Sequence, residues 1–121
     1  FVEKKHLFYG ELLKRQLEKN PNDFRAHMNY AVHLTHYKQY EEAEKEYKKT
    51  IELNPNFWKA YNGLGVLYFK KAVDNDYMTK AQINFQKALS KVKLEPFVHS
   101  NSVQRVVSNI KNINDIRKST L

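Results

Sequence analysis

The feature that most constrains the fold of this chain is a pattern of residues that returns after 34 positions. Three features share this spacing: Pro21 and Pro55, Tyr30-Ala31 and Leu64-Gly65, and Leu34 and Tyr68. A period of about 20–50 residues is typical of repeat architectures, in which each unit buries its apolar face against its neighbours. We therefore expect stacked copies of one small unit.

Between residues 24 and 57, apolar and small residues fall at spacings of three and four, which place them on one face of a helix. They form two sets: Ala26, Tyr30, Ala31, Val32 and Leu34, and then Tyr40, Ala43, Tyr47, Ile51 and Leu53. Only residues 37–39 separate the two sets. The two predicted helices must therefore fold back antiparallel.

The order of large, small and aromatic residues in this unit resembles the tetratricopeptide repeat. The first copy has His27, Tyr30-Ala31, Leu34, Ala43, Tyr47, Thr50 and Pro55 at the positions that define that family. The second copy has Tyr61, Leu64-Gly65, Tyr68, Ala81, Phe85 and Ala88. Small residues allow helix backbones to approach closely, and the aromatic residues fill the gaps beside them.

The resemblance implies an all-α fold, a right-handed superhelix of antiparallel helix pairs with about six helices and flanking capping helices. We expect a single domain over residues 1–121. It would contain a half repeat at 1–20, repeat one at 22–56, a lengthened repeat two at 57–96 and a C-terminal capping helix at 100–117. The helices of the two repeats are expected at about 24–37, 40–53, 57–72 and 77–92.

The second repeat carries four extra residues, because Tyr68 and Ala81 lie 13 positions apart whereas Leu34 and Ala43 lie 9 apart. Either its first helix runs a turn longer or the loop between its helices bulges. Asp, Asn and Asp at 74–76 favour turns, so we expect the loop there. Pro96 also comes late for the end of a repeat.

The first 20 residues predict an amphipathic helix. Its apolar face contains Phe1, Phe8, Tyr9, Leu12, Leu13 and Leu17. By register it is the second helix of a preceding repeat. Gly10 would cost about 1 kcal/mol inside this helix unless another group packs against it. Asn22 or Asp23 is expected to cap the helix that follows.

The C-terminal segment predicts a helix with one apolar stripe and a polar back, as in a helix that covers the end of a repeat stack. The stripe contains Val103, Val106, Val107, Ile110 and Ile113. Ser100 or Ser102 is expected to cap its start, and the residues after Ile116 are expected to fray.

The resemblance also implies a binding surface, because in this family the first helix of each pair lines the inside of the superhelix and holds an extended peptide. The inward positions are Arg25, Met28, Asn29, Val32 and His36 in repeat one, and Lys59, Asn62, Gly63, Val66, Phe69 and Lys70 in repeat two. The Asn29 amide offers a donor and an acceptor, as a peptide bond does. The basic residues favour an acidic or C-terminal peptide, although charged side chains on helix faces are commonly only solvated.

Some co-chaperones of this family grip a C-terminal carboxylate with five Lys, Asn and Arg residues on three first helices. Asn29 and Lys59 match two of these five positions, and Gly63 stands where the final Arg would be. The helix for the first two positions is absent from the given sequence. The resemblance therefore implies a protein-interaction module, a scaffold, adaptor or co-chaperone-like protein, without a complete clamp.

Charge suggests alternatives. Residues 1–55 hold 10 basic and 9 acidic side chains, whereas residues 56–121 hold 11 and 4. Lysines beside aromatic residues in the second half, at Phe69, Lys70, Lys71 and Tyr77, could contact nucleic acid or an acidic membrane surface, but the base-reading pattern of helical-repeat RNA binders is absent. A further alternative is a homo-oligomer or a piece of a longer array, because such stacks usually need about three repeats.

Other functional classes find no support in the sequence. It contains no phosphate-binding loop, nucleophile elbow or paired acids in an apolar context, so we expect neither an enzyme nor a cofactor. His27, His33 and His36 share one predicted helix but lack further ligands for a metal. The absence of cysteine fits a reducing compartment such as the cytoplasm. We expect no signal peptide or transmembrane segment in the given chain.

Overall fold

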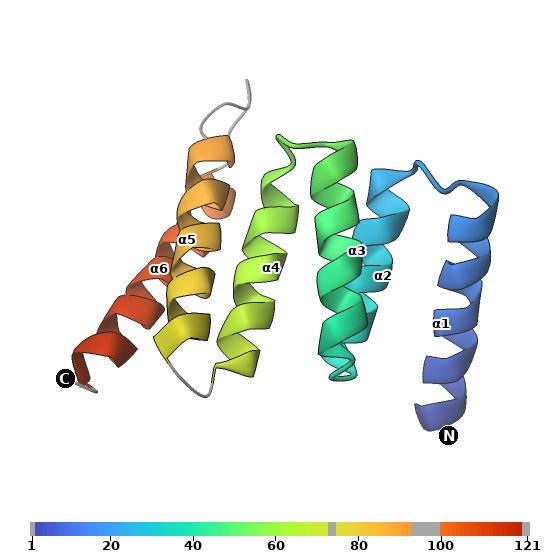
Figure 1. The fold of residues 1–121 in the computed structure, drawn as a ribbon, viewed down its shortest axis with the longest axis horizontal. Helices are drawn as coiled ribbons and strands as arrows, with labels where there is room; N and C mark the ends of the chain where they lie inside the picture. Colours follow the sequence, from blue (N-terminus) through green and yellow to red (C-terminus); the bar gives the residue numbers. More distant parts are fainter. Residues whose placement is uncertain (1, 73–74, 93–99, 120–121) are drawn as a thin grey trace. The chain divides into compact units, whose positions relative to one another are not determined.

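The computed structural model describes residues 2–72, 75–92 and 100–119, and these residues form six α-helices and no strand. They are α1 (Val2–Lys19), α2 (Phe24–His36), α3 (Tyr40–Leu53), α4 (Trp58–Lys71), α5 (Asn75–Val92) and α6 (Ser100–Ser119). Figure 1 shows their order along the chain. The predicted all-α repeat fold is confirmed, and so are the positions of the six helices to within a few residues.

The chain divides into two compact units, residues 1–55 with α1 to α3 and residues 56–121 with α4 to α6. In the first unit α2 packs mainly on α3 and also on α1. In the second unit α4 packs on α5, and α6 packs on α5 with a smaller contact to α4. The single domain predicted over residues 1–121 stays a prediction.

The α2–α3 hairpin is set by local signals at both ends of α2. The carboxylate of Asp23 accepts hydrogen bonds from the backbone N–H groups of Arg25 at 3.0 Å and Ala26 at 3.3 Å, which confirms it as the N-cap. At the other end, the N–H of Gln39 donates to the carbonyl of Leu34 at 2.8 Å. Lys38 takes the left-handed conformation there, with φ of 64°. This Schellman-type end reverses the chain within residues 37–39.

The core of each helix pair follows the predicted pattern of small and aromatic residues. In the first unit Ala31 and Ala43 are fully buried beside Tyr47. In the second unit a Cβ added to Gly65 would come within 2.6 Å of the Phe85 ring, so only a residue without a side chain fits there without displacement. Small residues therefore occupy these repeat positions because two helices approach each other closely there, as the sequence indicated.

The loop predicted at residues 74–76 is wrong for Asn75 and Asp76, which lie in α5, and residue 74 lies outside the described residues. The helices of both pairs are separated by three residues, 37–39 and 72–74, so the four extra residues do not lengthen the connection. α4 ends one residue beyond the position equivalent to His36, and α5 begins three residues before the position equivalent to Tyr40. The four extra residues therefore lengthen the helices, by one residue at the end of α4 and by three at the start of α5.

A reason for this extension is the chemistry of its first turn. Asp76 lies in the first turn of α5, where a carboxylate favours the helix dipole. Its carboxylate also pairs with Lys80 one turn later, at 3.5 Å. Asn75 and Asp76 thus start a helix instead of forming the turn. Pro96 lies outside the described residues.

α1 differs from the sequence prediction in the exposure of its apolar face. On α1 Leu13 is buried and Leu17 is half-buried, but Phe8, Tyr9 and Leu12 are exposed, so most of the predicted apolar face is open. Gly10 does have a close neighbour, because a Cβ there would lie 3.1 Å from Nε2 of His33.

At the C-terminus, α6 does not fray after Ile116. The Arg117 guanidinium donates hydrogen bonds to the Thr79 hydroxyl at 3.0 Å and to the Gln82 side chain, which fixes the end of α6 on α5. Ser100 and Ser102 both lie inside α6, so neither precedes it as a cap. Val106 and Ile113 of the predicted stripe are fully buried.

Candidate peptide-binding surface

The five candidate residues of repeat one lie on the side of α2 that its neighbours leave open. Arg25, Asn29, Val32 and His36 are exposed, and Met28 is half-buried. Val32 is 49% exposed although it is apolar. Since residues three and four apart on a helix share a face, the structure brings these five side chains together. A surface with an apolar centre and cationic and amide groups around it can hold a peptide main chain.

The candidate residues of repeat two lie on α4 at matching positions. Lys59 and Lys70 are exposed, whereas Asn62, Val66 and Phe69 are half-buried. Each of the pairs Arg25 and Lys59, Val32 and Val66, and His36 and Lys70 is separated by 34 residues. The two first helices therefore present the same sequence of basic, apolar and basic character. The two sets belong to different units and are described separately.

α6 also contributes to this surface, which the sequence did not predict. The Nδ2 group of Asn109 donates a hydrogen bond to Oδ1 of Asn62 at 2.8 Å, so one of the candidate amides is held by a residue 47 positions later. Asn109 was visible only as part of the polar back of a capping helix. Its role depends on the packing of α6 beside α4. This packing is a tertiary contact, so no pattern in the sequence indicates it.

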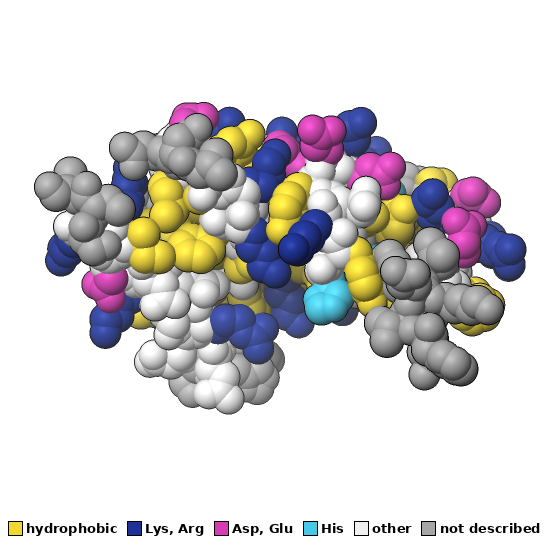
Figure 2. Space-filling model, turned by 90° about the horizontal axis from the view of Figure 1, so that it is seen from below, with side chains coloured by type: hydrophobic (Ala, Val, Ile, Leu, Met, Phe, Trp, Pro, Cys, Tyr) yellow, Lys and Arg dark blue, Asp and Glu magenta, His cyan; other side chains and the backbone are white. Residues whose placement is uncertain are grey.

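Both first helices lack acidic side chains. α2 and α4 contain no acidic residue, whereas α3 carries five glutamates and three lysines. Figure 2 shows one face of the molecule, on which Lys and Arg side chains lie among apolar ones. A helix without carboxylates does not repel an acidic ligand, and the exposed cations attract one.

The position of α2 is fixed by a buried histidine. His27 is 8% exposed, and its Nδ1 lies 2.6 Å from the Glu46 carboxylate on α3. Its Nε2 lies 2.7 Å from the carbonyl oxygen of Pro21. The Pro21 carbonyl can only accept, and so can an ionised Glu46 carboxylate. The two hydrogen bonds are therefore made together when both ring nitrogens carry protons, or when a protonated Glu46 carboxyl donates to Nδ1. His27 thus serves to orient α2, and it lies on the buried side of the helix.

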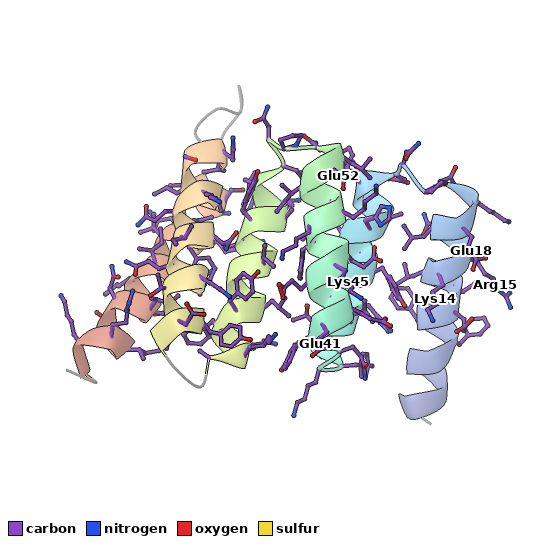
Figure 3. All side chains as sticks on the ribbon, viewed as in Figure 1. Lys14, Arg15, Glu18, Glu41, Lys45 and Glu52 are labelled. Atoms are coloured by element: carbon purple, nitrogen blue, oxygen red, sulfur yellow. The ribbon has the colours of Figure 1, made fainter. Side chains whose placement is uncertain are left out.

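A cleft of about 470 Å³ lies on another side of the first unit, between α1, α2 and α3. Its lining carries charges of both signs: Lys14, Leu17, Glu18, Tyr30, Glu42, Lys45 and Glu46. Figure 3 labels Lys14 and Glu18 on α1 and Lys45 on α3. Burial raises the pKa of the Tyr30 hydroxyl, and Lys14, which hydrogen-bonds to it, partly offsets that rise. Because cations and carboxylates nearly balance, this cleft does not select an acidic ligand.

The aromatic and basic cluster considered for nucleic acid is internally paired. The ammonium groups of Lys71 and Lys80 lie 4.9 Å and 5.2 Å from the centre of the Tyr77 ring. Both lysines thus contact the same Tyr77 ring on which a nucleic-acid base would have to stack. Nucleic-acid binding stays an alternative that the sequence favours less than peptide binding.

Two further properties can be stated for the part of the chain that the structure describes. No three His, Cys, Asp or Glu side chains there are grouped in a way that could hold a metal ion. No helix in the same residues combines the length and the apolar character that crossing a membrane requires.

Comparison with known proteins agrees with the repeat pattern. A family model described as "TPR repeat" matches residues 34–71. Hsp70-Hsp90 organizing protein 3 of Arabidopsis thaliana is 38% identical over 82 residues, which are 67% of this chain and 13% of that protein. The structure of the TPR2B domain of yeast Sti1 in complex with pHsp70 superposes with a TM-score of 0.78 at 18% identity, covering 95% of this chain and 87% of that one.

The chain belongs to the tetratricopeptide repeat (TPR) family. A second TPR structure, the first TPR of Spaghetti (RPAP3) bound to the HSP90 peptide SRMEEVD, has a TM-score of 0.75 at 15% identity and covers 98% of this chain and 84% of its own. At these identities the structural matches show the fold alone. The chain spans about an eighth of the length of the curated relative, 13%.

Proposed function

We propose that this TPR chain is a protein-interaction module that binds extended, acidic peptides on the exposed faces of its first helices, α2 in the first unit and α4 in the second. The observation that carries the proposal is the absence of acidic residues from both first helices, together with matched exposed cations at Arg25 and Lys59. A carboxylate-rich peptide meets attraction and no repulsion on either face.

The role of each group follows from its chemistry. The basic side chains at the start and end of each helix pair with carboxylates of the ligand. Asn29 is exposed and offers its amide to the ligand backbone. Val32, which is 49% exposed, contacts apolar side chains between the acids. Scaffold, adaptor and co-chaperone-like roles all require this type of binding.

Two solved TPR structures support the choice of ligand. The Spaghetti TPR domain is bound to the peptide SRMEEVD, which contains two Glu and one Asp. The TPR2B domain of yeast Sti1 is in complex with pHsp70. The acidic character of the SRMEEVD ligand is the one that the charges of α2 and α4 favour. This peptide is therefore the first probe to test.

The test is a binding titration of fluorescein-labelled SRMEEVD with the intact chain, followed by anisotropy at two salt concentrations. We expect the double variant Arg25→Glu/Lys59→Glu to weaken binding by about tenfold or more, since it removes two cations and adds two repulsive charges. The matched control is Lys87→Glu/Lys111→Glu, which makes the same charge change at exposed positions on α5 and α6. Equal losses in both variants would mean that net charge alone attracts the peptide and would contradict the proposed surface.

A further inference from the structure

Two side-chain amides meet between α4 and α6. The Nδ2 group of Asn109 donates a hydrogen bond to Oδ1 of Asn62 at 2.8 Å. Both helices belong to the unit of residues 56–121, in which α6 contacts α4 directly. Both side chains are half-buried, so their bond forms at the edge of the packed surface and not in the core. The amide pair therefore stays accessible to a ligand.

The hydrogen bond between the two amides leaves other polar groups of the pair unused. An amide side chain has two donors on its nitrogen and two lone pairs on its oxygen. Among the residues that the structure describes, neither the NH2 group of Asn62 nor Oδ1 of Asn109 has a hydrogen-bond partner. A partly buried polar group without a partner costs free energy, because it has lost water without replacement. The pair thus offers a donor from α4 and an acceptor from α6.

A donor and an acceptor side by side match the edge of an extended peptide. One residue of an extended chain presents its N–H and its C=O on the same edge, which is how antiparallel strands exchange two hydrogen bonds. The NH2 group of Asn62 can donate to that C=O, and Oδ1 of Asn109 can accept from that N–H. Because main-chain groups are common to all peptides, such contacts give affinity without reading side chains.

The repeat pattern does not supply this pair. The residue 34 positions after Asn29 is Gly63, and the residue 34 positions before Asn62 is Met28, which has no amide. Asn109 lies on α6, outside both repeats. The pair exists because α6 packs beside α4, so it is a property of the second unit and not a copy of the amide on α2.

A cation lies one turn before each amide of the pair. Lys59 precedes Asn62 by three residues, Arg105 precedes Asn109 by four, and both cations are exposed. Residues three and four apart on a helix are neighbours on its surface. Acidic side chains next to the bound main chain are therefore attracted from both helices, whereas basic ones are repelled.

We propose, on the basis of the peptide-binding function proposed above, that Asn62 and Asn109 together hold the main chain of an extended acidic peptide in the second unit. Asn62 donates to a peptide carbonyl, and Asn109 accepts from the N–H of the same peptide residue. α6 is then a second wall of the binding surface as well as a cap of the repeat.

The experiment uses SRMEEVD peptides in which one backbone amide at a time is replaced by an ester. The ester keeps the extended shape of the peptide but has no N–H to donate to Oδ1 of Asn109. Fluorescence anisotropy titrations measure the affinity of each analogue for the intact chain. We expect one analogue to bind about fivefold more weakly than SRMEEVD, which is the effect of one hydrogen bond.

The decisive variant is Asn109→Leu, which is close to Asn in shape and has neither polar group. It should bind SRMEEVD about fivefold more weakly than the unmodified chain does, and the ester analogue no more weakly than SRMEEVD. A merely structural role of Asn109 would weaken both peptides alike and keep their ratio at about fivefold. Gln104→Leu is the matched control, since it removes an exposed amide from another side of α6 and should change neither affinity.

Two results for Asn109→Leu would overturn this inference. Unchanged affinity for SRMEEVD would show that the pair does not contact the peptide. Tighter binding would show that Asn109 covers Asn62 and competes with the peptide. In both cases the proposed function stands if Arg25→Glu/Lys59→Glu still weakens binding, whereas no binding of SRMEEVD to the unmodified chain contradicts both. Because each ratio compares two peptides on one variant, it does not depend on the folded fraction of that variant.

Discussion

The helix pairs α2–α3 and α4–α5 solve the same packing problem with different chemistry. At the same repeat position, the first pair buries His27 and the second buries Tyr61, each 8% exposed. In the first pair the residue opposite is Glu46, which bonds the imidazole. In the second pair the equivalent residue is Asn84, whose amide donates to the carbonyl of Lys80 in its own helix.

This difference shows that repeat positions specify size and burial more strictly than polarity. A buried imidazole needs partners for both nitrogens, and the first pair provides them from α3 and from the chain before α2. The second pair instead has Gly65 directly against the Phe85 ring, where the first pair has Ala31 and Tyr47. The α2–α3 pair therefore depends on a polar link, the hydrogen bond between His27 and Glu46. The α4–α5 pair depends on steric fit between Gly65 and the Phe85 ring.

The largest effect should come from breaking the polar link. Glu46→Ala removes the acceptor at 2.6 Å from Nδ1 of His27 and leaves a largely buried ring nitrogen without it. We expect a loss of about 1.5–3 kcal/mol in the free energy of unfolding, the range for hydrogen bonds to charged groups. Urea denaturation followed by circular dichroism measures it.

The control for that prediction is Glu44→Ala, which removes an ion pair with Lys48, a lysine whose side chain is 63% exposed. Exposed pairs of this type contribute about 0.3–0.5 kcal/mol. A double-mutant cycle with His27→Leu should also show coupling between His27 and Glu46. If Glu46→Ala cost no more than Glu44→Ala, the polar link would not be what distinguishes the first pair.

An intermediate effect is expected from the steric fit of the second pair. Gly65→Ala should destabilise the chain by about 1–2 kcal/mol, because the strain of a methyl group 2.6 Å from Phe85 exceeds the roughly 1 kcal/mol that Ala gains in a helix. The opposite change in the first pair, Ala31→Gly, should also destabilise. Thermal melts of the two variants give the comparison.

Rescue separates steric strain from other causes in this case. Phe85→Leu leaves room beside residue 65, so adding Gly65→Ala to it should cost less stability than Gly65→Ala alone. The same thermal melts measure this difference. An increase in stability for Gly65→Ala in the original background would contradict the close fit.

The smallest expected effect on stability comes from the contact between two buried hydroxyl groups. The hydroxyls of Thr35 and Tyr47 lie 3.4 Å apart, so Tyr47→Phe should cost at most about 0.5–1 kcal/mol at neutral pH. Burial raises the pKa of Tyr47 from its usual 10.0, and the bond with Thr35 partly offsets the rise. The stability that this shift contributes is complete below pH 10 and is lost as the pH rises through the higher pKa of the folded state.

Tyr47→Phe should therefore lose less stability than the unmodified chain between pH 8 and pH 11. Burial also raises the pKa of Tyr61 in the second unit, so Tyr61→Phe provides the matched variant. Denaturation at pH 8 and at pH 11 measures how much stability each variant and the unmodified chain lose. A Tyr47→Phe chain with the same alkaline loss as the unmodified one would show that this buried phenol does not contribute.

Most of the fold could be predicted because its signals are local or strictly periodic. The spacing of Ala31, Ala43 and Tyr47 identified a helical hairpin, and the return of Tyr30-Ala31 and Leu34 after 34 residues identified the repeat. Asp23 was recognised as a cap because its role depends only on the residues that follow it. The extension of α5 was not predicted, because turn-forming residues such as Asn75 and Asp76 also start helices.

The candidate surface was predicted in part. The exposed positions on α2, such as Arg25 and Val32, followed from the resemblance to the family, whereas the apolar pattern alone grouped Val32, which is 49% exposed, with the residues of the packed face. The engagement of Asn62 by Asn109 did not, because no spacing rule connects residues 47 positions apart. Whether α2 and α4 bind one peptide stays a prediction, and the titration with SRMEEVD tests it.

The sequence by itself determined the six helices, the register of the repeat and the class of the fold, since these depend on spacings of three, four and 34 residues. Only the tertiary structure decided which of the possible faces is covered. It buries Leu13 and leaves Phe8 and Leu12 open, although all three belong to one predicted apolar face. The reason is that periodicity specifies which side chains share a face, whereas burial depends on whether another helix lies against them.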